Sequence, residues 1–315
     1  MTHSPSPLPE TAQIGRTALT VSDLDLVTEF YRDVLGLDVI DHDGRDDHGG
    51  WDNHDKWDDR DERDGGGPTA TLGADGVPLL VLMEDEDAPA RQPAEAGLFH
   101  NAFRVPSRAA LGDALGRIRD RWQLDGASDH GVSEALYLSD PEGNGIEVYR
   151  DRPAAEWPMA ADGSVQMDTL PLDLDDVAAD ASGEPNAPSG TTVGHVHLEV
   201  SSLNRAREFY VETLGLNVRM AFRQSALFLA AGTYHHHLGV NTWQGRSQPK
   251  TGRGLAWFEF VVPDEPVLGD LRERLEAAGV LVSDGGGDWD EGIENQSGVI
   301  ECADPDGIVI RIRTS

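Results

Sequence analysis

Polar and apolar residues alternate in the stretch GHVHLEV (194–200), where His195, His197 and Glu199 are separated by Val196 and Leu198. Successive side chains of a β-strand point to opposite faces, so this pattern predicts a strand with one apolar face. The other face carries two imidazoles and a carboxylate. The alternation therefore places possible metal-ligating or acid–base side chains on the face opposite the core.

The same pattern of strand and helix occurs twice along the chain. VSDLDLVTEFYRDVLGLDV (21–39) reappears as VSSLNRAREFYVETLGLNV (200–218), and Phe30/Phe209 and Gly36/Gly215 are each 179 residues apart. Each copy predicts a strand followed by a helix that Ser22, or Ser201/Ser202, caps and that glycine ends. Repetition at a fixed offset is the signature of duplicated structural modules.

A second, weaker repeat completes the pattern. GLFHNAFRVP (97–106) matches GLAWFEFVVP (254–263), and DPEGNGIEVYRD (140–151) matches DPDGIVIRIRTS (304–315). Helical segments follow at 107–122 and 265–279. The chain therefore divides into four modules that begin with a strand and helix and end in strands, at about 12–85, 96–152, 192–245 and 253–315. We expect two modules in 1–152, two in 192–315, and a linker over 153–191.

An insertion rich in Asp, Gly and His interrupts the first module at 41–67. It cannot bury a core, which predicts a solvated or cation-stabilised surface loop. Its Asp spacing does not match an EF-hand loop, so we favour the solvated loop.

The charge balance is strongly acidic, with 57 acidic and 25 basic residues and a formal net charge of −32. Nucleic acid and anionic membrane would be repelled. With only two lysines, Lys56 and Lys250, such a surface suits a cytoplasm of very high salt, and we predict a halophilic host. Cys302 is the single cysteine, which excludes an intramolecular disulfide and a cysteine-based metal cluster. The N-terminus lacks a signal-peptide pattern, and no apolar run approaches the roughly 18 residues that span a bilayer, so we expect a soluble, cytoplasmic protein.

The repeated motifs VSDL…EFYRDVLGL and DPEGNGIEVYRD resemble those of the vicinal oxygen chelate superfamily, which includes glyoxalases, bleomycin resistance proteins and extradiol dioxygenases. The resemblance implies an α+β fold in which four βαβββ modules pair into two cup-shaped sheets. With four modules, the closest branch is similar to the catechol 2,3-dioxygenases, which cleave an aromatic ring beside its hydroxyls.

In this superfamily, metal ligands come from the first strand of two modules and the last strand of one. At those positions the chain has candidate ligands in His100, Glu147 and His195, whereas the other modules carry Arg16, Trp257 and Arg311. Two imidazoles and one carboxylate are typical of non-haem Fe(II), and Mn(II) would fit the same ligands. Because His195 belongs to the third module, the second and third modules must share one cup, leaving the first and fourth without ligands. A lone histidine is more often simply packed, but the coincidence of all three favours a metal site.

The resemblance also implies acid–base groups. The run TYHHHLGVNTW (233–243) aligns His236 with the acid–base histidine of ring-cleaving dioxygenases, whereas strand alternation would instead point His235 and His237 into the cup. Tyr137, ten residues before Glu147, matches a tyrosine that hydrogen-bonds the substrate, and His130 is a candidate donor near it. A strand aromatic and a loop histidine are their plainer roles.

These features predict a metal-dependent extradiol dioxygenase that acts with O2 on a small aromatic diol. One alternative is a glyoxalase-like isomerase or lyase, against which Gly239 counts because that branch places a carboxylate ligand there. Another is a non-catalytic protein that binds an aromatic compound. A homo-oligomer is left open, and fold alone does not choose between these functions.

Overall fold

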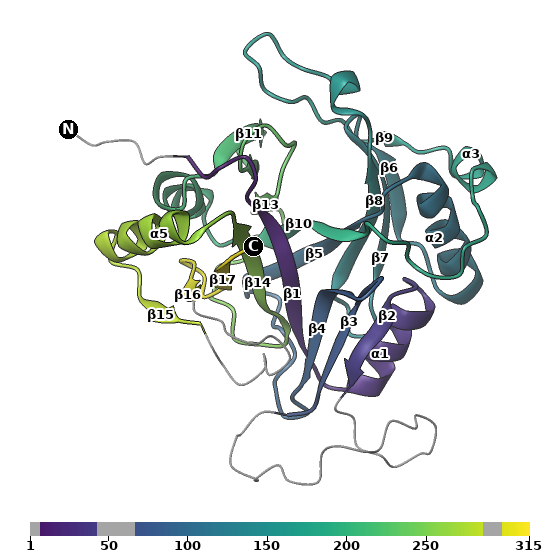
Figure 1. Cartoon of the computed structure of the whole chain (residues 1–315), viewed down its shortest axis with the longest axis horizontal. Coiled ribbons are helices and arrows are strands. Elements are labelled where there is room, and N and C mark those ends of the chain that lie inside the picture. Colours follow the sequence, from purple (N-terminus) through teal and green to yellow (C-terminus); the bar gives the residue numbers. More distant parts are fainter. Residues whose placement is uncertain (1–6, 43–66, 286–297) are drawn as a thin grey trace.

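The computed structural model describes residues 7–42, 67–285 and 298–315, which form two curled sheets flanked by helices (Figure 1). The fold is α+β with paired cup-shaped sheets, as predicted. Among the helices of the described part, none is both long and apolar enough to cross a membrane.

The eight-stranded sheet combines strands of the first and fourth modules. Its β1 pairs antiparallel with β14, and its spatial order is β15 (Val282–Asp284), β16 (Val299–Ala303), β17 (Val309–Thr314), β14 (Gly254–Val262), β1 (Gln13–Val21), β4 (Val77–Glu84), β3 (Thr69–Ala74) and β2 (Asp38–His42).

The nine-stranded sheet combines the second and third modules, as expected from the position of His195. Here β10 pairs antiparallel with β5, and the order is β11 (Asn217–Phe222), β12 (Ala226–Ala230), β13 (Leu238–Asn241), β10 (Thr192–Glu199), β5 (Gly97–Arg104), β8 (Gly145–Asp151), β7 (Ser133–Ser139), β6 (Gly126–Asp129) and β9 (Leu170–Pro171). Each sheet therefore draws strands from both halves of the chain.

Helices lie against the outer sides of the sheets. Figure 1 shows α1 beside β2–β4, α2 and α3 beside the β6–β8 region, and α5 beside β14–β17. The helical segments are α1 (Leu24–Asp33), α2 (Arg108–Arg121), the 3-10 turn η1 (Ala154–Glu156), α3 (Leu174–Ala179), α4 (Leu203–Arg207), the π-helical turn η2 (Glu208–Thr213) and α5 (Glu265–Ala277). Apolar side chains from both sheets and these helices form one extensive core.

The ends of the repeated helices are mostly as the sequence predicts. Ser202 caps α4, and Gly36 and Gly215 adopt positive φ after the two helices. The cap predicted at Ser22 is wrong, because the Asp23 carboxylate accepts the Leu26 N–H at 2.9 Å. Ser22 instead donates its N–H and hydroxyl to Glu142, at 2.7 and 2.9 Å, and so ties the first module to the second.

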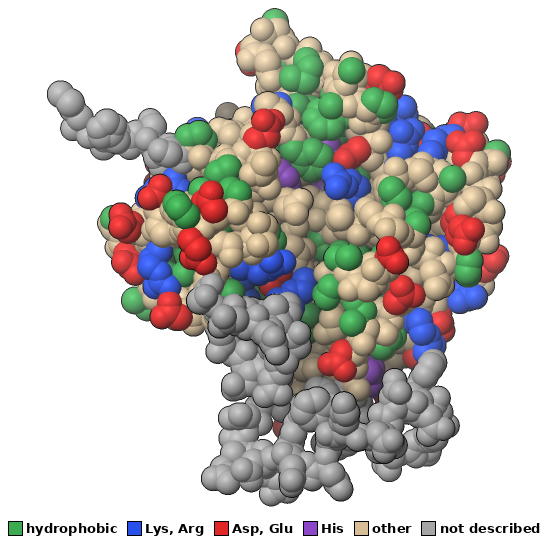
Figure 2. Space-filling model, viewed as in Figure 1, with side chains coloured by type: hydrophobic (Ala, Val, Ile, Leu, Met, Phe, Trp, Pro, Cys, Tyr) green, Lys and Arg blue, Asp and Glu red, His purple; other side chains and the backbone are tan. Residues whose placement is uncertain are grey.

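The sequence predicts an insertion and a linker outside the four modules. The insertion at 41–67 begins at the end of β2, and its residues 43–66 lie outside the described part of the chain, as does its suggested cation site. The linker over 153–191 contains η1, β9 and α3, and β9 pairs with β6 at the edge of the nine-stranded sheet. Acidic side chains are scattered over the face shown in Figure 2 rather than gathered into one patch.

Candidate metal centre

Three side chains from neighbouring strands converge in the nine-stranded sheet. His195 lies on β10, His100 on β5 and Glu147 on β8, and these strands are adjacent in the order β10–β5–β8. The Nε2 atoms of the two histidines are 3.2 Å apart, and Glu147 Oε2 lies 3.0 Å from that of His100 and 3.2 Å from that of His195. All three side chains are buried. Their donor atoms form one compact group suited to a single metal ion.

The backbone around His195 shows how this convergence arises. The pairing of β10 with β5 is irregular between Val193 and His195, which is the sign of a β-bulge. Bulges change the direction of a side chain at the edge of a functional site. Gly194 is required here, because a Cβ atom at this residue would lie 1.9 Å from the hydroxyl of Tyr149.

The protonation states of the group suit ligation. Burial lowers the pKa of His195 to about 4, against the opposing effect of Glu147, so the imidazole is neutral at neutral pH. Burial acts to raise the pKa of Glu147, but the two neighbouring imidazoles outweigh it and hold that pKa well below its usual value. Metals bind neutral imidazole and ionised carboxylate, which are the forms favoured at His195 and Glu147.

Gly239 lies beside this group and cannot supply a fourth ligand. His197 and Gly239 are partners across β10 and β13, and a Cβ atom on Gly239 would lie 2.7 Å from the His197 ring. That ring is buried and accepts a hydrogen bond from Asn241 Nδ2 at 3.1 Å. His197 therefore fills the space that a side chain at residue 239 would need.

Tyr137 and His130 lie together on the β7 side of the group. Tyr137 is the cross-strand partner of Glu147, and its ring centroid is 5.8 Å from that of His100. Its hydroxyl lies 2.7 Å from Nε2 of His130, whose Nδ1 lies 2.6 Å from the carbonyl oxygen of Asp168. A carbonyl only accepts, so Nδ1–H donates to it, and with the ring proton on Nδ1 the Nε2 atom can accept from the tyrosine hydroxyl. Burial and the Glu147 carboxylate raise the pKa of Tyr137 well above its usual value.

Of the three consecutive histidines, His236 lies against His195, with ring centroids 4.1 Å apart. His235 bonds Asp151 through Nε2 at 2.8 Å, and His237 Nδ1 accepts the Ala231 N–H at 3.2 Å. Strand alternation does not apply to them, because β13 begins only at Leu238. Burial and the surrounding imidazoles lower the pKa of His236 well below its usual value.

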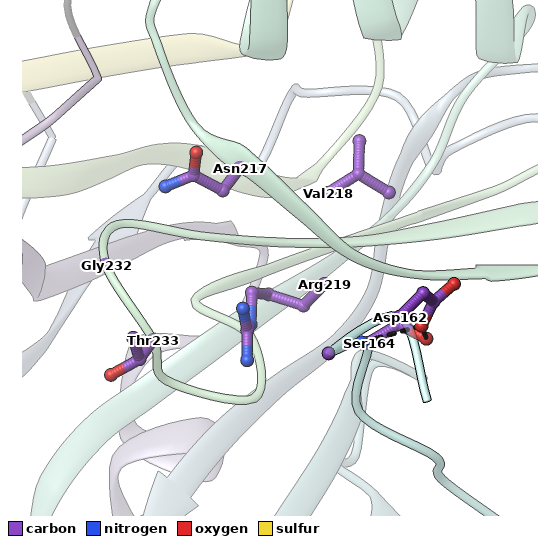
Figure 3. A pocket seen from close by; sticks show the side chains of 8 residues that line it. Asp162, Ser164, Asn217, Val218, Arg219, Gly232 and Thr233 are labelled. Carbon is purple, nitrogen blue, oxygen red and sulfur yellow. Dashed lines mark hydrogen bonds between the residues drawn. The ribbon is translucent and has the colours of Figure 1, made fainter. Parts of the chain in front are cut away.

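Two features lie apart from the metal-ligand group. Glu199, on the polar face of GHVHLEV, is ion-paired with Arg91 and Arg246 instead of joining it. A surface depression of about 610 Å³ is lined by Asp162, Gly163, Ser164, Asn217, Val218, Arg219, Gly232 and Thr233. Arg219 lies between Thr233 and Ser164 there (Figure 3). This depression contains none of the predicted site residues, so we assign it no part in the chemistry.

Sequence reasoning missed two contributions to this centre. Asp168, in the linker, fixes His130 through its backbone carbonyl, which no side-chain pattern reveals. Asp151 bonds His235 from a position 84 residues away, and only the pairing of the second and third modules brings the two together.

The fold and the convergent histidine–carboxylate group define a class of protein. The family model of the Glyoxalase/Bleomycin resistance protein/Dioxygenase superfamily matches residues 13–148 and 192–312, and the chain belongs to this family.

Among individual proteins, the chain is 35% identical to catechol-2,3-dioxygenase of Bacillus subtilis (strain 168) over 283 residues, covering 87% of this chain and 91% of that protein. A putative dioxygenase structure from Bacillus subtilis subsp. subtilis str. 168 matches with a TM-score of 0.62 at 13% identity, covering 98% of this chain and 86% of that one. Glyoxalase I from Zea mays matches with a TM-score of 0.56 at 14% identity, covering 96% and 92%. These two structural matches indicate the fold alone.

Proposed function

We propose that this protein is an extradiol ring-cleaving dioxygenase that inserts O2 into a small aromatic diol at a mononuclear non-haem metal. The observation that carries the proposal is a buried set of two imidazoles and one carboxylate whose nearby fourth-ligand position, Gly239, is filled by the His197 ring. Such a set leaves open positions on a metal. The similarity to catechol-2,3-dioxygenase over most of the chain supports the same function.

His100 and His195 would hold the metal through Nε2, and Glu147 through its carboxylate. The donor set fits Fe(II) first and Mn(II) second, since imidazole and carboxylate suit both ions. When bound, the metal would supply the positive charge that favours loss of protons from a diol and the site where the diol and O2 meet.

The protein groups flank the metal-ligand set on two sides. Tyr137, next to His100 and hydrogen-bonded to His130, would accept a hydrogen bond from one hydroxyl of the diol. His236, next to His195, would take a proton from the substrate and return it during ring opening. A neutral His236 can accept a proton, and its low pKa keeps it neutral. The buried surroundings would keep bulk water away from the reacting ring.

A glyoxalase-like isomerase or lyase is the weaker alternative. In that branch a carboxylate serves as a fourth ligand at the position of Gly239, where this protein has no side chain and His197 fills the space. A non-catalytic aromatic-binding role would leave the buried histidine–carboxylate group without a purpose.

The test is oxygen uptake by Fe(II)-reconstituted protein in molar KCl when catechol is added, followed by the absorbance of the ring-opened product. We expect uptake, and we expect His236→Phe to lower kcat by about 10²–10⁴-fold, the range for an acid–base group. His237→Asn is the matched control, because Asn Oδ1 can still accept the Ala231 N–H. Tight metal binding without uptake would favour non-oxidative chemistry, and failure to bind metal would contradict the ligand assignment.

A further inference from the structure

A chain of hydrogen-bonded side chains leads from His236 away from the metal-ligand group. Nδ1 of His236 lies 2.7 Å from Nδ1 of His235, and Nε2 of His235 lies 2.8 Å from Oδ1 of Asp151. The His235 side chain is fully buried, whereas that of Asp151 is 21% exposed. The chain therefore joins a buried ring beside His195 to a carboxylate that reaches solvent.

Several groups hold Asp151 in place. The hydroxyl of Tyr234 donates to its carboxylate, with oxygen distances of 3.2 and 3.0 Å, and Arg104 Nη1 lies 3.4 Å from Oδ2. Tyr149 hydrogen-bonds Tyr234 at 2.9 Å. Trp157, from the linker, packs against His235 with ring centroids 5.2 Å apart. A carboxylate fixed by this many partners keeps one orientation toward His235.

The donors and acceptors in this chain determine where the protons lie. An ionised carboxylate only accepts, so His235 donates to Asp151 through Nε2–H. If the two imidazoles carry no net charge, His235 Nδ1 is then an acceptor, and His236 must donate through Nδ1–H. In this arrangement each donor of the series faces one acceptor, from His236 Nδ1–H to His235 Nδ1 and from His235 Nε2–H to the Asp151 carboxylate.

The remaining nitrogen of His236 is the one that can act. The hydrogen bond of His236 within the described residues is made through Nδ1, which leaves Nε2 available for a substrate proton. We propose that Asp151 and His235 are positioning residues that hold His236 with its proton on Nδ1 and its lone pair on Nε2. This inference rests on the proposed function, because it assigns His236 the part of the proton acceptor.

The chain resembles the arrangement by which a buried aspartate fixes the tautomer of a catalytic histidine in hydrolases, where the wrong tautomer costs activity although the geometry is kept. Here the aspartate acts through a second histidine. His237 is adjacent in sequence but does not belong to this series of hydrogen bonds, since its Nδ1 accepts the Ala231 N–H.

The test reads the tautomers by long-range ¹H–¹⁵N correlation on the full-length protein, labelled with ¹⁵N-histidine and loaded with diamagnetic Zn²⁺. In the wild type we expect His236 protonated on Nδ1 and His235 on Nε2. His235→Phe keeps a ring but removes both nitrogens, and Asp151→Leu keeps the branched shape but removes the acceptor. In both variants His236 should no longer be a single tautomer protonated on Nδ1. In His237→Asn the tautomer of His236 should be the same as in the wild type. Thermal unfolding shows whether each variant is folded.

The same variants are then assayed with Fe(II) and catechol. We expect His235→Phe and Asp151→Leu to lower kcat about 10- to 100-fold, the scale for outer hydrogen-bond partners, with little change in KM. A wild-type His236 protonated on Nε2, or one whose tautomer is the same in folded His235→Phe, would overturn the proposal. Because the tautomer is measured without turnover, an inactive wild type would count against the dioxygenase function and not against the positioning chain.

Discussion

The two sheets of this protein are built from the same modules, yet only one gathers candidate metal ligands among its described residues. At the three positions of His195, His100 and Glu147 in the nine-stranded sheet, the eight-stranded sheet has Arg16, Trp257 and Arg311. The bulge next to His195 recurs next to Arg16, between Ile14 and Thr17 of β1. The backbone that aims a ligand is therefore present in both sheets, and the side chains make the difference.

Ion pairs and an apolar cluster occupy the eight-stranded sheet. Arg16 bonds Glu259, with Nη2–Oε1 at 2.6 Å, and Arg311 Nε bonds Glu301 at 3.0 Å. Trp257 lies between the two arginines, whose guanidinium carbons are 5.7 and 4.2 Å from its ring centroid. Two guanidinium groups at the equivalent positions would repel a metal cation, and the described side chains there form ion pairs and packing contacts instead.

A second pair of facing residues also differs between the two sheets, here in the size of the side chains. His197 faces Gly239 in one sheet, and the equivalent Ala18 faces Val81 in the other. In the first case the imidazole needs the space above a glycine, and in the second a small residue packs with Val81 and Trp257. The same fold therefore has polar side chains at these positions in the nine-stranded sheet and apolar side chains in the eight-stranded sheet.

The largest expected effect is the loss of metal binding when a ligand position is changed in the nine-stranded sheet but not in the eight-stranded sheet. His195→Ala removes one of three ligands and should abolish stoichiometric Mn²⁺ binding, because loss of even an outer partner costs about 10–100-fold in affinity. Arg16→Ala, at the equivalent position, should bind as the wild type does. Isothermal titration calorimetry measures both. Equal affinities in the two variants would show that the ligand assignment is wrong.

Substitution of a ligand-equivalent residue in the eight-stranded sheet should lower stability without affecting metal binding. Trp257 is 4% exposed, and Trp257→Ala should lower the free energy of unfolding by about 3–5 kcal/mol through the cavity that it leaves. Metal stoichiometry should stay the same. Urea titration at fixed salt measures the loss, with His100→Ala as the counterpart that loses metal instead. A Trp257→Ala protein that is folded but binds no metal would contradict the separation of roles.

The pH dependence of stability gives a third comparison. Burial raises the pKa of Asp304 to about 6, although its hydrogen bonds act to lower it. The folded state then binds more protons than the unfolded state between about pH 4 and 6, so stability falls as pH rises through this window, by up to about 3 kcal/mol. Asp304→Asn should remove that loss, since its amide is uncharged and can still bond the Tyr210 hydroxyl.

Unfolding free energies of the wild type and Asp304→Asn, measured between pH 4 and 7, test this prediction. The difference should move in favour of the variant as pH rises. Burial also raises the pKa of Asp140, the equivalent residue of the other sheet, so Asp140→Asn should change the slope in the same direction. A difference that stays constant with pH would refute the prediction.

The smallest expected effect concerns Gly239. Gly239→Ala places a methyl group 2.7 Å from the His197 ring and should cost about 1–3 kcal/mol of stability. Gly116→Ala is the control, because a Cβ atom there meets nothing within 4 Å inside α2, and it should stabilise by about 0.5–1 kcal/mol. Thermal unfolding distinguishes the two. A neutral Gly239→Ala would show that His197 can move and that a ligand could stand there.

Much of the fold was predictable because the repeats carry it. The constant offset of 179 residues places β1 and β10 in equivalent positions, and the alternation in GHVHLEV identifies β10 as a strand with a polar face. His100, Glu147 and His195 could be selected together because they occupy equivalent positions of a repeated pattern. In the structure the donor atoms of these three residues lie within 4.8 Å of one another, and their roles as ligands stay a proposal.

The rest depends on geometry that no periodicity encodes. The orientation of His235, His236 and His237 could not be read from alternation, because they lie in the bend before β13. The cap at Ser22 was assigned wrongly because the hydroxyl is bound by Glu142, which is 120 residues away. Tertiary contacts override local preference in both places.

We expect one metal ion to lie in the nine-stranded sheet between His100, Glu147 and His195. Anomalous diffraction from a crystal of the Mn²⁺-loaded protein would locate this ion. We predict one strong peak within bonding distance of Nε2 of both histidines and the Glu147 carboxylate, with none beside Arg16, Trp257 and Arg311. A peak in the eight-stranded sheet, or none at the three candidate ligands, would contradict the account.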